Sequence, residues 1–188
     1  AKHYDLLFVG RLIKIKGIDD LLRAAAVVRK KQVELKIAII GRGPEKKNLQ
    51  FLAKKLKINS NVVWAESVTD LDLLHLYNSS RIAVFPSTAN EGVLTTMLEA
   101  AACGSAVITT NCCGMPEFLK HNKNGLLVKP HNSKELASSI NRLLCDTILR
   151  KQIGRNAVDS INKDWTWEKQ VKKLELIYKA CLKKQKII

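Results

Sequence analysis

The sequence lacks any long apolar run. None of its stretches approaches the roughly 20 consecutive apolar residues that a membrane-spanning helix needs. Its first residues enter an apolar strand pattern directly, without the basic and then apolar leader of a secreted protein. The 188 residues are 46% apolar and 26% charged, an ordinary composition for one soluble domain with a sizeable core. We therefore expect a cytoplasmic protein.

Cysteine and histidine are few and are not spaced as metal ligands. The five cysteines contain no CxxC pair, and the four histidines are scattered among them. An odd number of cysteines also argues against a disulfide framework. We expect reduced, mostly buried thiols and no bound metal.

Aromatic residues are scarce, at 5%, and the 17 acidic residues are outnumbered by 32 basic ones, which gives a formal net charge of +15. This excess would attract anionic partners over a long range, although solvated lysines on helix faces would give the same composition. Proteins that bind single-stranded nucleic acid interleave aromatic with basic residues, and this chain does not. Nucleic acid is therefore not the expected partner.

Short apolar runs rich in valine and isoleucine alternate with helical patterns. The runs are hydrophobic throughout, which is typical of parallel strands covered on both faces. The alternation predicts a doubly wound, Rossmann-like α/β domain with a parallel sheet. The expected strands are 5–10, 35–41, 61–65, 81–86, 106–110 and 125–128, and the expected helices are 19–31, 44–56, 70–78, 94–103 and 133–145.

After Asp146 the pattern becomes all-helical. Its last part carries one apolar stripe, made of Val171, Leu174, Ile177, Tyr178 and Cys181. Such a stripe must pack either on the sheet or on another part of a longer protein. We expect a single domain over 1–188, with 147–188 as a helical C-terminal extension. Because the chain starts just before a strand and without methionine, we also expect it to be a piece of a longer protein.

Polar loops follow four of the expected strands, with the sequences GRLIKIKG, GRGP, PSTANEG and TTNCCGMPE. They should meet at one edge, because ligands of open α/β sheets bind beyond the carboxyl ends of the strands. In the first loop, Arg11 and Lys16 precede a helix start and could hold a diphosphate, or could simply solvate a turn. GRGP lacks the spacing of a P-loop or a dinucleotide fingerprint, so we interpret it as a tight strand-to-helix turn.

The stretch NEGVLTTMLEAAACG places Glu91 and Glu99 with seven residues between them. At about 100° per residue, Glu99 projects away from the apolar side of its helix, so both carboxylates could border the same crevice. Carboxylates there can accept hydrogen bonds from sugar hydroxyls. Thr96 and Glu99 also fit a capping box with Thr96 as the N-cap residue, and the local pattern leaves both interpretations open.

Several stretches together carry a resemblance to a known family. They are VGRLIKIKG, IIGRGPE, PSTANEG followed by LEAAACGSAVITT, GMPEFL, NGLLV and the WTWE helix. In this order they resemble the C-terminal half of a family 4 glycosyltransferase, a retaining class with the GT-B fold, and the resemblance covers essentially the whole chain. In that family the C-terminal domain binds a nucleotide-sugar donor, and an N-terminal Rossmann-like acceptor domain, absent here, binds the acceptor.

The resemblance implies a role for each site residue. Arg11 and Lys16 would hold the donor diphosphate and stabilise the leaving nucleoside diphosphate, Glu91 would contact the transferred sugar, and Glu99 would take the ribose hydroxyls. No metal and no cofactor are implied, because cations and a helix N-terminus can neutralise the leaving group. Backbone contacts would come from Gly92, Val93 and Leu94 to sugar and phosphate, and from Ser67 and Val68 to the base.

Two residues depart from the family's pattern. Leu94 stands where a small residue or proline is usual, and could crowd the sugar or reshape the loop. Glu66 stands beside the base at a position that is commonly glycine. Both departures leave the donor open between UDP-linked and GDP-linked sugars.

The expected function is donor binding in a retaining, metal-independent glycosyltransferase that transfers a hexose to a glycan or lipid-linked acceptor in surface polysaccharide biosynthesis. The lysine excess should favour peripheral contact with anionic lipid at the inner face of the membrane. Without an acceptor domain, the chain itself should be inactive in transfer. Two alternatives stay open: a nucleotide-sugar epimerase of the same architecture, and a non-catalytic basic module that binds nucleic acid or anionic lipid.

Overall fold

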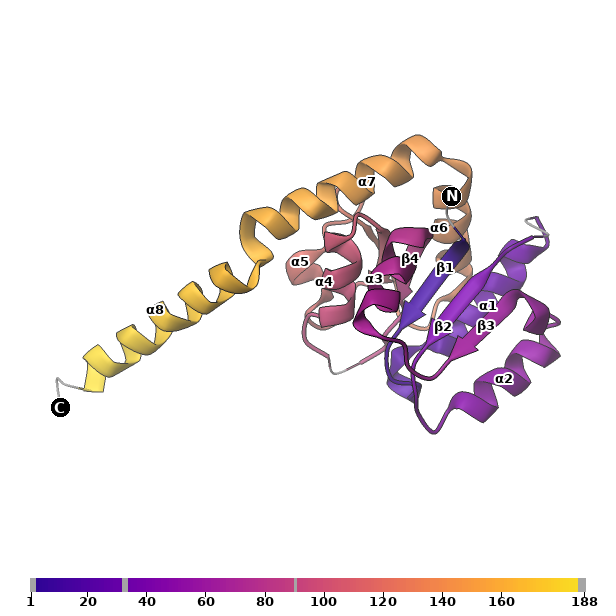
Figure 1. Ribbon diagram of the computed structural model, residues 1–188, viewed down its shortest axis with the longest axis horizontal. Helices are drawn as coiled ribbons and strands as arrows, with labels where there is room; N and C mark the ends of the chain where they lie inside the picture. The colour runs from indigo at the N-terminus through magenta and orange to yellow at the C-terminus, as the bar shows by residue number, and fades with distance from the viewer. Residues whose placement is uncertain (1–2, 32–33, 90, 186–188) are drawn as a thin grey trace.

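A computed structural model describes residues 3–31, 34–89 and 91–185. Within these residues, one sheet has the strand order β3-β2-β1-β4-β5-β6, and all of its pairings are parallel. Figure 1 labels its first four strands, β1 to β4. The expected doubly wound parallel sheet is confirmed. Its strands are β1 (Tyr4–Val9), β2 (Ile37–Ile40), β3 (Val62–Ala65), β4 (Ser80–Phe85), β5 (Ala106–Thr110) and β6 (Leu126–Val128).

The central strands are mostly apolar because both faces of the sheet are covered there. In β1, Leu6 and Phe8 belong to one core cluster, whereas Leu7 and Val9 belong to the cluster on the opposite face, and all four are buried. The first face is covered by α1 (Ile18–Arg29), α2 (Lys46–Lys55) and α6 (Ser133–Cys145). The second is covered by α3 (Asp70–Ser79), α4 (Thr95–Ala102) and α5 (Met115–Phe118).

The strand order reverses between β1 and β4. The chain runs outward from β1 through β2 to β3, and then returns to lay β4 on the other side of β1. The chain passes from β1 to α1 on one face of the sheet and from β4 to α4 on the other, and ligands of such sheets bind beyond the strand ends at this point.

The helices expected from the sequence are all present, and one short helix was missed. α5 has only four residues and a proline in its first turn, so it is too short to show a helical period. Short turns of other helix types also occur at η1 (Lys14–Lys16), η2 (Asn59–Asn61) and η3 (Ile161–Trp165).

The C-terminal extension divides into two helices with different environments. α7 (Thr147–Ser160) packs against β5 and α4, whereas α8 (Trp167–Gln185) points away from the body of the domain (Figure 1). The apolar stripe of α8 is exposed, at 50% for Val171, 46% for Leu174 and 58% for Ile177. It therefore does not pack on the sheet, which was one of the two alternatives left by the sequence.

The expectation of mostly buried thiols is wrong. Cys103 and Cys112 are half-buried, and the other three cysteines are exposed, because they lie in a loop, at the end of α6 and on α8. None of the five forms a disulfide. Within the described ranges, no helix combines the length and the apolar character that crossing a membrane would require.

Candidate functional site

A pocket of about 340 Å³ lies at the carboxyl ends of β1 and β4, where the strand order reverses. It brings together six residues that the sequence marked as site residues. Its lining consists of Gly10, Arg11, Lys16, Glu91, Gly92, Val93, Leu94, Thr95 and Thr96.

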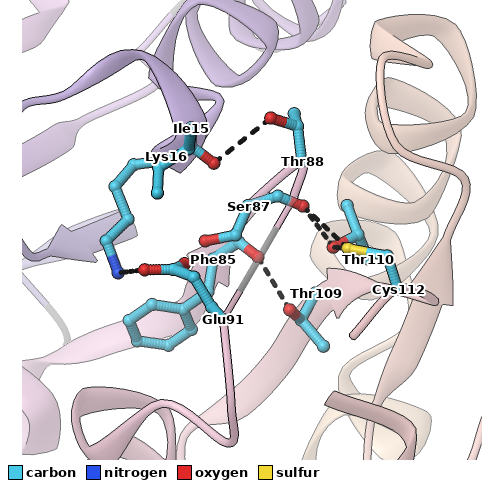
Figure 2. A network of polar contacts seen from close by, with 9 residues as sticks. All are labelled: Ile15, Lys16, Phe85, Ser87, Thr88, Glu91, Thr109, Thr110 and Cys112. Atoms are coloured by element: carbon cyan, nitrogen blue, oxygen red, sulfur yellow. Dashed lines mark hydrogen bonds and ion pairs between the residues drawn. The ribbon is translucent and has the colours of Figure 1, made fainter. Parts of the chain in front are cut away.

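Lys16 and Glu91 form an ion pair at the pocket (Figure 2). The Lys16 Nζ lies 2.6 Å from Glu91 Oε1, and the two side chains are only 10% and 9% exposed. Charged residues are seldom so buried unless they are paired, because removing a charge from water is costly. Each charge therefore compensates the other while both border the pocket.

The second carboxylate oxygen of Glu91 is buried and has no hydrogen-bond partner among the described residues. A buried acceptor without a donor loses the hydrogen bonds it would make with water. This oxygen is therefore an open acceptor beside the pocket, suited to a hydroxyl of a bound molecule.

The loop that carries Glu91 is anchored on one side by β5. The hydroxyl of Thr109 donates to the Phe85 carbonyl at 2.7 Å, and the hydroxyl of Thr110 donates to the Ser87 carbonyl at 2.5 Å. Both threonines are buried at the carboxyl end of β5. Their hydroxyls thus fix the path of the chain as it leaves β4.

On its other side, the same loop is joined to the loop that carries Lys16. The Thr88 N–H donates to the Ile15 carbonyl at 2.8 Å. Gly17 has φ 63°, and a Cβ at this position would lie 2.0 Å from the Pro86 carbonyl oxygen. Only glycine permits this conformation and this approach without strain, so the two loops touch backbone to backbone and bring Lys16 to Glu91.

The GMPE loop supports the Glu91 segment through Gly114. The Gly114 N–H donates to the Glu91 carbonyl at 3.0 Å. A Cβ on Gly114 would lie 2.7 Å from backbone atoms of Gly92 and Val93. Gly114 was not among the site residues predicted from the sequence. The sequence signal that could have found it is GMPE, which is one of the stretches that carry the family resemblance.

The GRGP turn is structural, as expected. The Leu12 N–H donates to the Arg42 carbonyl at 2.7 Å, and the Glu45 N–H donates to the Leu12 carbonyl at 3.0 Å. A Cβ at Gly43 would lie 2.2 Å from the Leu12 carbonyl oxygen. The turn therefore braces the loop that presents Arg11, whose own side chain is exposed at the rim of the pocket.

The capping box is wrong. α4 begins at Thr95 with Leu94 as its N-cap residue and no side-chain cap, so Thr96 already lies inside the helix. Glu99 is exposed, as the helical geometry predicts, and its Oε2 accepts a hydrogen bond from the Tyr77 hydroxyl at 2.9 Å. Leu94 lines the pocket and also packs against the core.

The two residues expected to contact the nucleotide base, Ser67 and Val68, do not line this pocket. Ser67 and Val68 follow β3, the edge strand, two strands away from β1. The Ser67 hydroxyl accepts a hydrogen bond from Arg42 Nη2 at 2.9 Å, and Val68 packs against the core. Glu66 pairs with Lys46 at 2.8 Å, and this hydrogen bond lowers the pKa of the Glu66 carboxyl below its usual value.

Nothing in the described part of the chain gathers three or more His, Cys, Asp or Glu residues as a metal would need. Residues 70–72 form an Asp-x-Asp triplet, whose two carboxylates could in principle bind a metal, but Asp72 instead helps to cap the start of α3. The Thr69 hydroxyl donates to Asp72 Oδ2 at 2.7 Å and accepts from the Asp72 N–H at 3.1 Å, which caps the helix. Metal independence remains a prediction.

The fold and the pocket define a Rossmann-like domain whose two cations and one carboxylate meet at the switch point of the sheet. The family profile described as glycosyl transferases group 1 matches residues 1–159. The chain belongs to this family of transferases.

Two relatives illustrate the family. Over 178 residues the chain is 34% identical to a D-inositol 3-phosphate glycosyltransferase of Corynebacterium jeikeium, covering 91% of this chain and 42% of that protein. Over 181 residues it is 30% identical to the capsular polysaccharide biosynthesis glycosyltransferase CapM of Staphylococcus aureus, covering 94% of this chain and 46% of that one. The chain thus spans less than half the length of these relatives.

Among solved structures, HepE of Anabaena in complex with UDP and glucose superposes with a TM-score of 0.82, covering 94% of this chain and 49% of that one. The identity is 24%, so the likeness shows the fold alone. The shared fold is Rossmann-like, and the structural neighbours that have it are GT-B glycosyltransferases.

Proposed function

We propose that this chain is the nucleotide-sugar-binding half of a retaining, family 4 glycosyltransferase that transfers a hexose. The observation that carries the proposal is the single pocket that joins Arg11, Lys16 and Glu91 at the switch point. A diphosphate requires cations, and a sugar requires hydrogen-bond acceptors. Membership of the group 1 family, and the UDP and glucose bound by HepE, support the same assignment.

The diphosphate would lie between Arg11 and Lys16. Arg11 offers a planar fork of N–H donors at the rim, whereas Lys16 is a point charge with three donors. One Lys16 donor goes to Glu91, which leaves two for phosphate oxygens. The backbone N–H groups at the start of α4, which lines the pocket at Thr95 and Thr96, add further positive potential.

These groups would also serve the reaction. When the bond between sugar and diphosphate breaks, negative charge grows on the leaving phosphate. Fixed cations at that point stabilise the developing charge without a metal and without a cofactor. The open oxygen of Glu91 would accept a hydrogen bond from a hydroxyl of the transferred sugar and hold it in place.

The acceptor would bind to a further domain of the longer protein. The relatives are more than twice as long as this chain, and the apolar stripe of α8 is exposed along the helix. We propose that the acceptor domain covers this stripe, which has the one-sided apolar pattern of a packing helix. The chain is therefore expected to bind nucleotide yet to transfer no sugar to glycan acceptors, and measurable turnover by the chain alone would contradict this.

The name of CapM supports a role in surface polysaccharide biosynthesis. The net charge of +15 would favour peripheral contact with anionic lipid. The proposed donor is a UDP-linked or GDP-linked hexose.

Replacing Arg11 with alanine tests the donor site without disturbing the core, because this side chain is exposed. Calorimetric titration of the wild-type chain with UDP and GDP should show micromolar binding of at least one. Arg11→Ala should weaken that binding at least about tenfold, the usual cost of losing a charged hydrogen bond.

The matched control is Arg155→Ala, which removes an exposed arginine from α7 and lowers the net charge equally. It should leave nucleotide affinity unchanged. If neither nucleotide binds the wild-type chain, or if both variants behave alike, the proposed donor site is wrong.

A further inference from the structure

Among the residues of α3, each of which the structure describes, Tyr77 is the only buried one. Only 2% of its surface is exposed. It belongs to the core cluster that also contains Met97 and Ala100 of α4. Its hydroxyl lies at the edge of this apolar cluster and donates a hydrogen bond to Glu99 Oε2 at 2.9 Å.

The backbone around Tyr77 is also fixed. The Ser105 hydroxyl donates to the Tyr77 carbonyl at 2.8 Å, and the Ser80 hydroxyl donates to the Leu76 carbonyl at 2.6 Å. Ser80 and Ser105 are both buried. The phenol therefore projects from a rigid support, formed by the end of α3 and the turn that follows α4.

The Tyr77 phenol stays protonated and donates a hydrogen bond to Glu99. Burial raises the pKa of Tyr77 well above its usual value, and the nearby Glu99 charge raises it further. The hydroxyl thus stays protonated over the whole range in which the protein would work. The acceptor that the structure provides for its proton is Glu99.

Glu99 lies on the pocket side of α4. It follows Thr95 by four residues and Thr96 by three, and both of these line the pocket. Residues at these spacings share one face of a helix, so Glu99 extends the pocket lining by one turn. The bond from Tyr77 occupies only part of the carboxylate, which has about four lone-pair sites.

We propose that Tyr77 is a positioning residue that holds Glu99 ready to accept the two ribose hydroxyls of the donor nucleotide. An exposed glutamate samples many rotamers, and ordering it on binding costs conformational entropy. A hydrogen bond from a rigid phenol restricts the carboxylate beforehand, which is preorganisation. The inference deepens the proposed function and rests on it.

The test separates ribose recognition from the rest of nucleotide binding. UDP and GDP are each compared with their 2′,3′-dideoxy forms by calorimetry, using the wild-type, Tyr77→Phe and Tyr4→Phe chains. Tyr77→Phe keeps the ring and removes only the hydroxyl. Tyr4→Phe makes the same change in a partly buried tyrosine that packs against the same core cluster, at the start of β1 and away from the pocket.

In the wild type, the ribonucleotide should bind about tenfold more tightly than its dideoxy form, as expected for hydrogen bonds to a carboxylate. Tyr77→Phe should reduce this preference to about threefold or less, with the affinity for the dideoxy form unchanged. Tyr4→Phe should change neither affinity. In a Glu99→Ala chain the preference should be lost, and adding Tyr77→Phe should lower it no further.

An unchanged preference in Tyr77→Phe would overturn the inference. So would an equal loss of affinity for both nucleotide forms, since that result would show a purely structural role. Failure of the proposed function looks different: the wild-type chain would then bind no nucleotide of either form, and both proposals would fall together.

Discussion

Replacing Lys16 with methionine is expected to lower the free energy of unfolding by about 3 kcal/mol. The methionine fills a similar volume but leaves the Glu91 carboxylate buried without its cation. Both side chains are about nine-tenths buried, so solvent can do little to screen the orphaned charge. For a chain of this length, the loss corresponds to a fall in Tm of roughly 6–12 °C, which calorimetry measures directly.

Two comparisons make this result specific to the ion pair. Lys14→Met removes an exposed lysine from the same short helix and should leave the stability unchanged. The double variant Lys16→Met/Glu91→Leu should recover most of the lost stability, because an apolar pair needs no compensation in a buried site. If the double variant is as unstable as Lys16→Met, or if Lys14→Met is equally damaging, the buried ion pair does not explain the effect.

Replacing Gly17 with alanine is expected to cost at least about 3 kcal/mol and to abolish nucleotide binding. The left-handed conformation alone disfavours a side chain by about 1–2 kcal/mol. The added Cβ would also lie 2.0 Å from the Pro86 carbonyl oxygen, which is backbone and cannot rotate away. The two loops must separate to relieve this clash, which breaks the hydrogen bond between Thr88 and Ile15.

Gly92→Ala is the matched control, because it makes the same chemical change in the same pocket. A Cβ at Gly92 would meet nothing within 4 Å, so the unfolding free energy should change by less than about 0.5 kcal/mol. Denaturant unfolding of both variants measures the difference. Equal stability of Gly17→Ala and Gly92→Ala would show that close contact between the two loops does not hold the site together.

The fold could be predicted from the sequence because its signals are local. The run IAII of β2 is apolar and buried at every position, which is typical of a strand whose two faces are both covered. Once the strands are parallel, their following loops must meet at one edge, so the order of the strands and loops along the chain was enough to place Arg11, Lys16 and Glu91 together.

Other parts of the site could not be predicted, because they depend on contacts between distant residues. The pairing of Lys16 with Glu91 requires two loops to touch through glycine, and the partner of Glu99 lies on another helix at Tyr77. The capping box at Thr96 failed because the N-cap residue of α4 is Leu94, two residues earlier. The exposure of α8 depends on what its apolar stripe meets, which its periodicity does not reveal.

A nucleoside diphosphate is expected to bind at the pocket between β1 and β4. Backbone amide shifts of the 21.0 kDa chain, followed by NMR during titration with UDP and with GDP, test it most directly. Saturable shifts are expected at Gly10, Arg11 and Glu91 and along the start of α4. Shifts confined to the hollow at the opposite edge of the sheet, lined by His3, Lys36 and Arg81, or no shifts with either nucleotide, would contradict it.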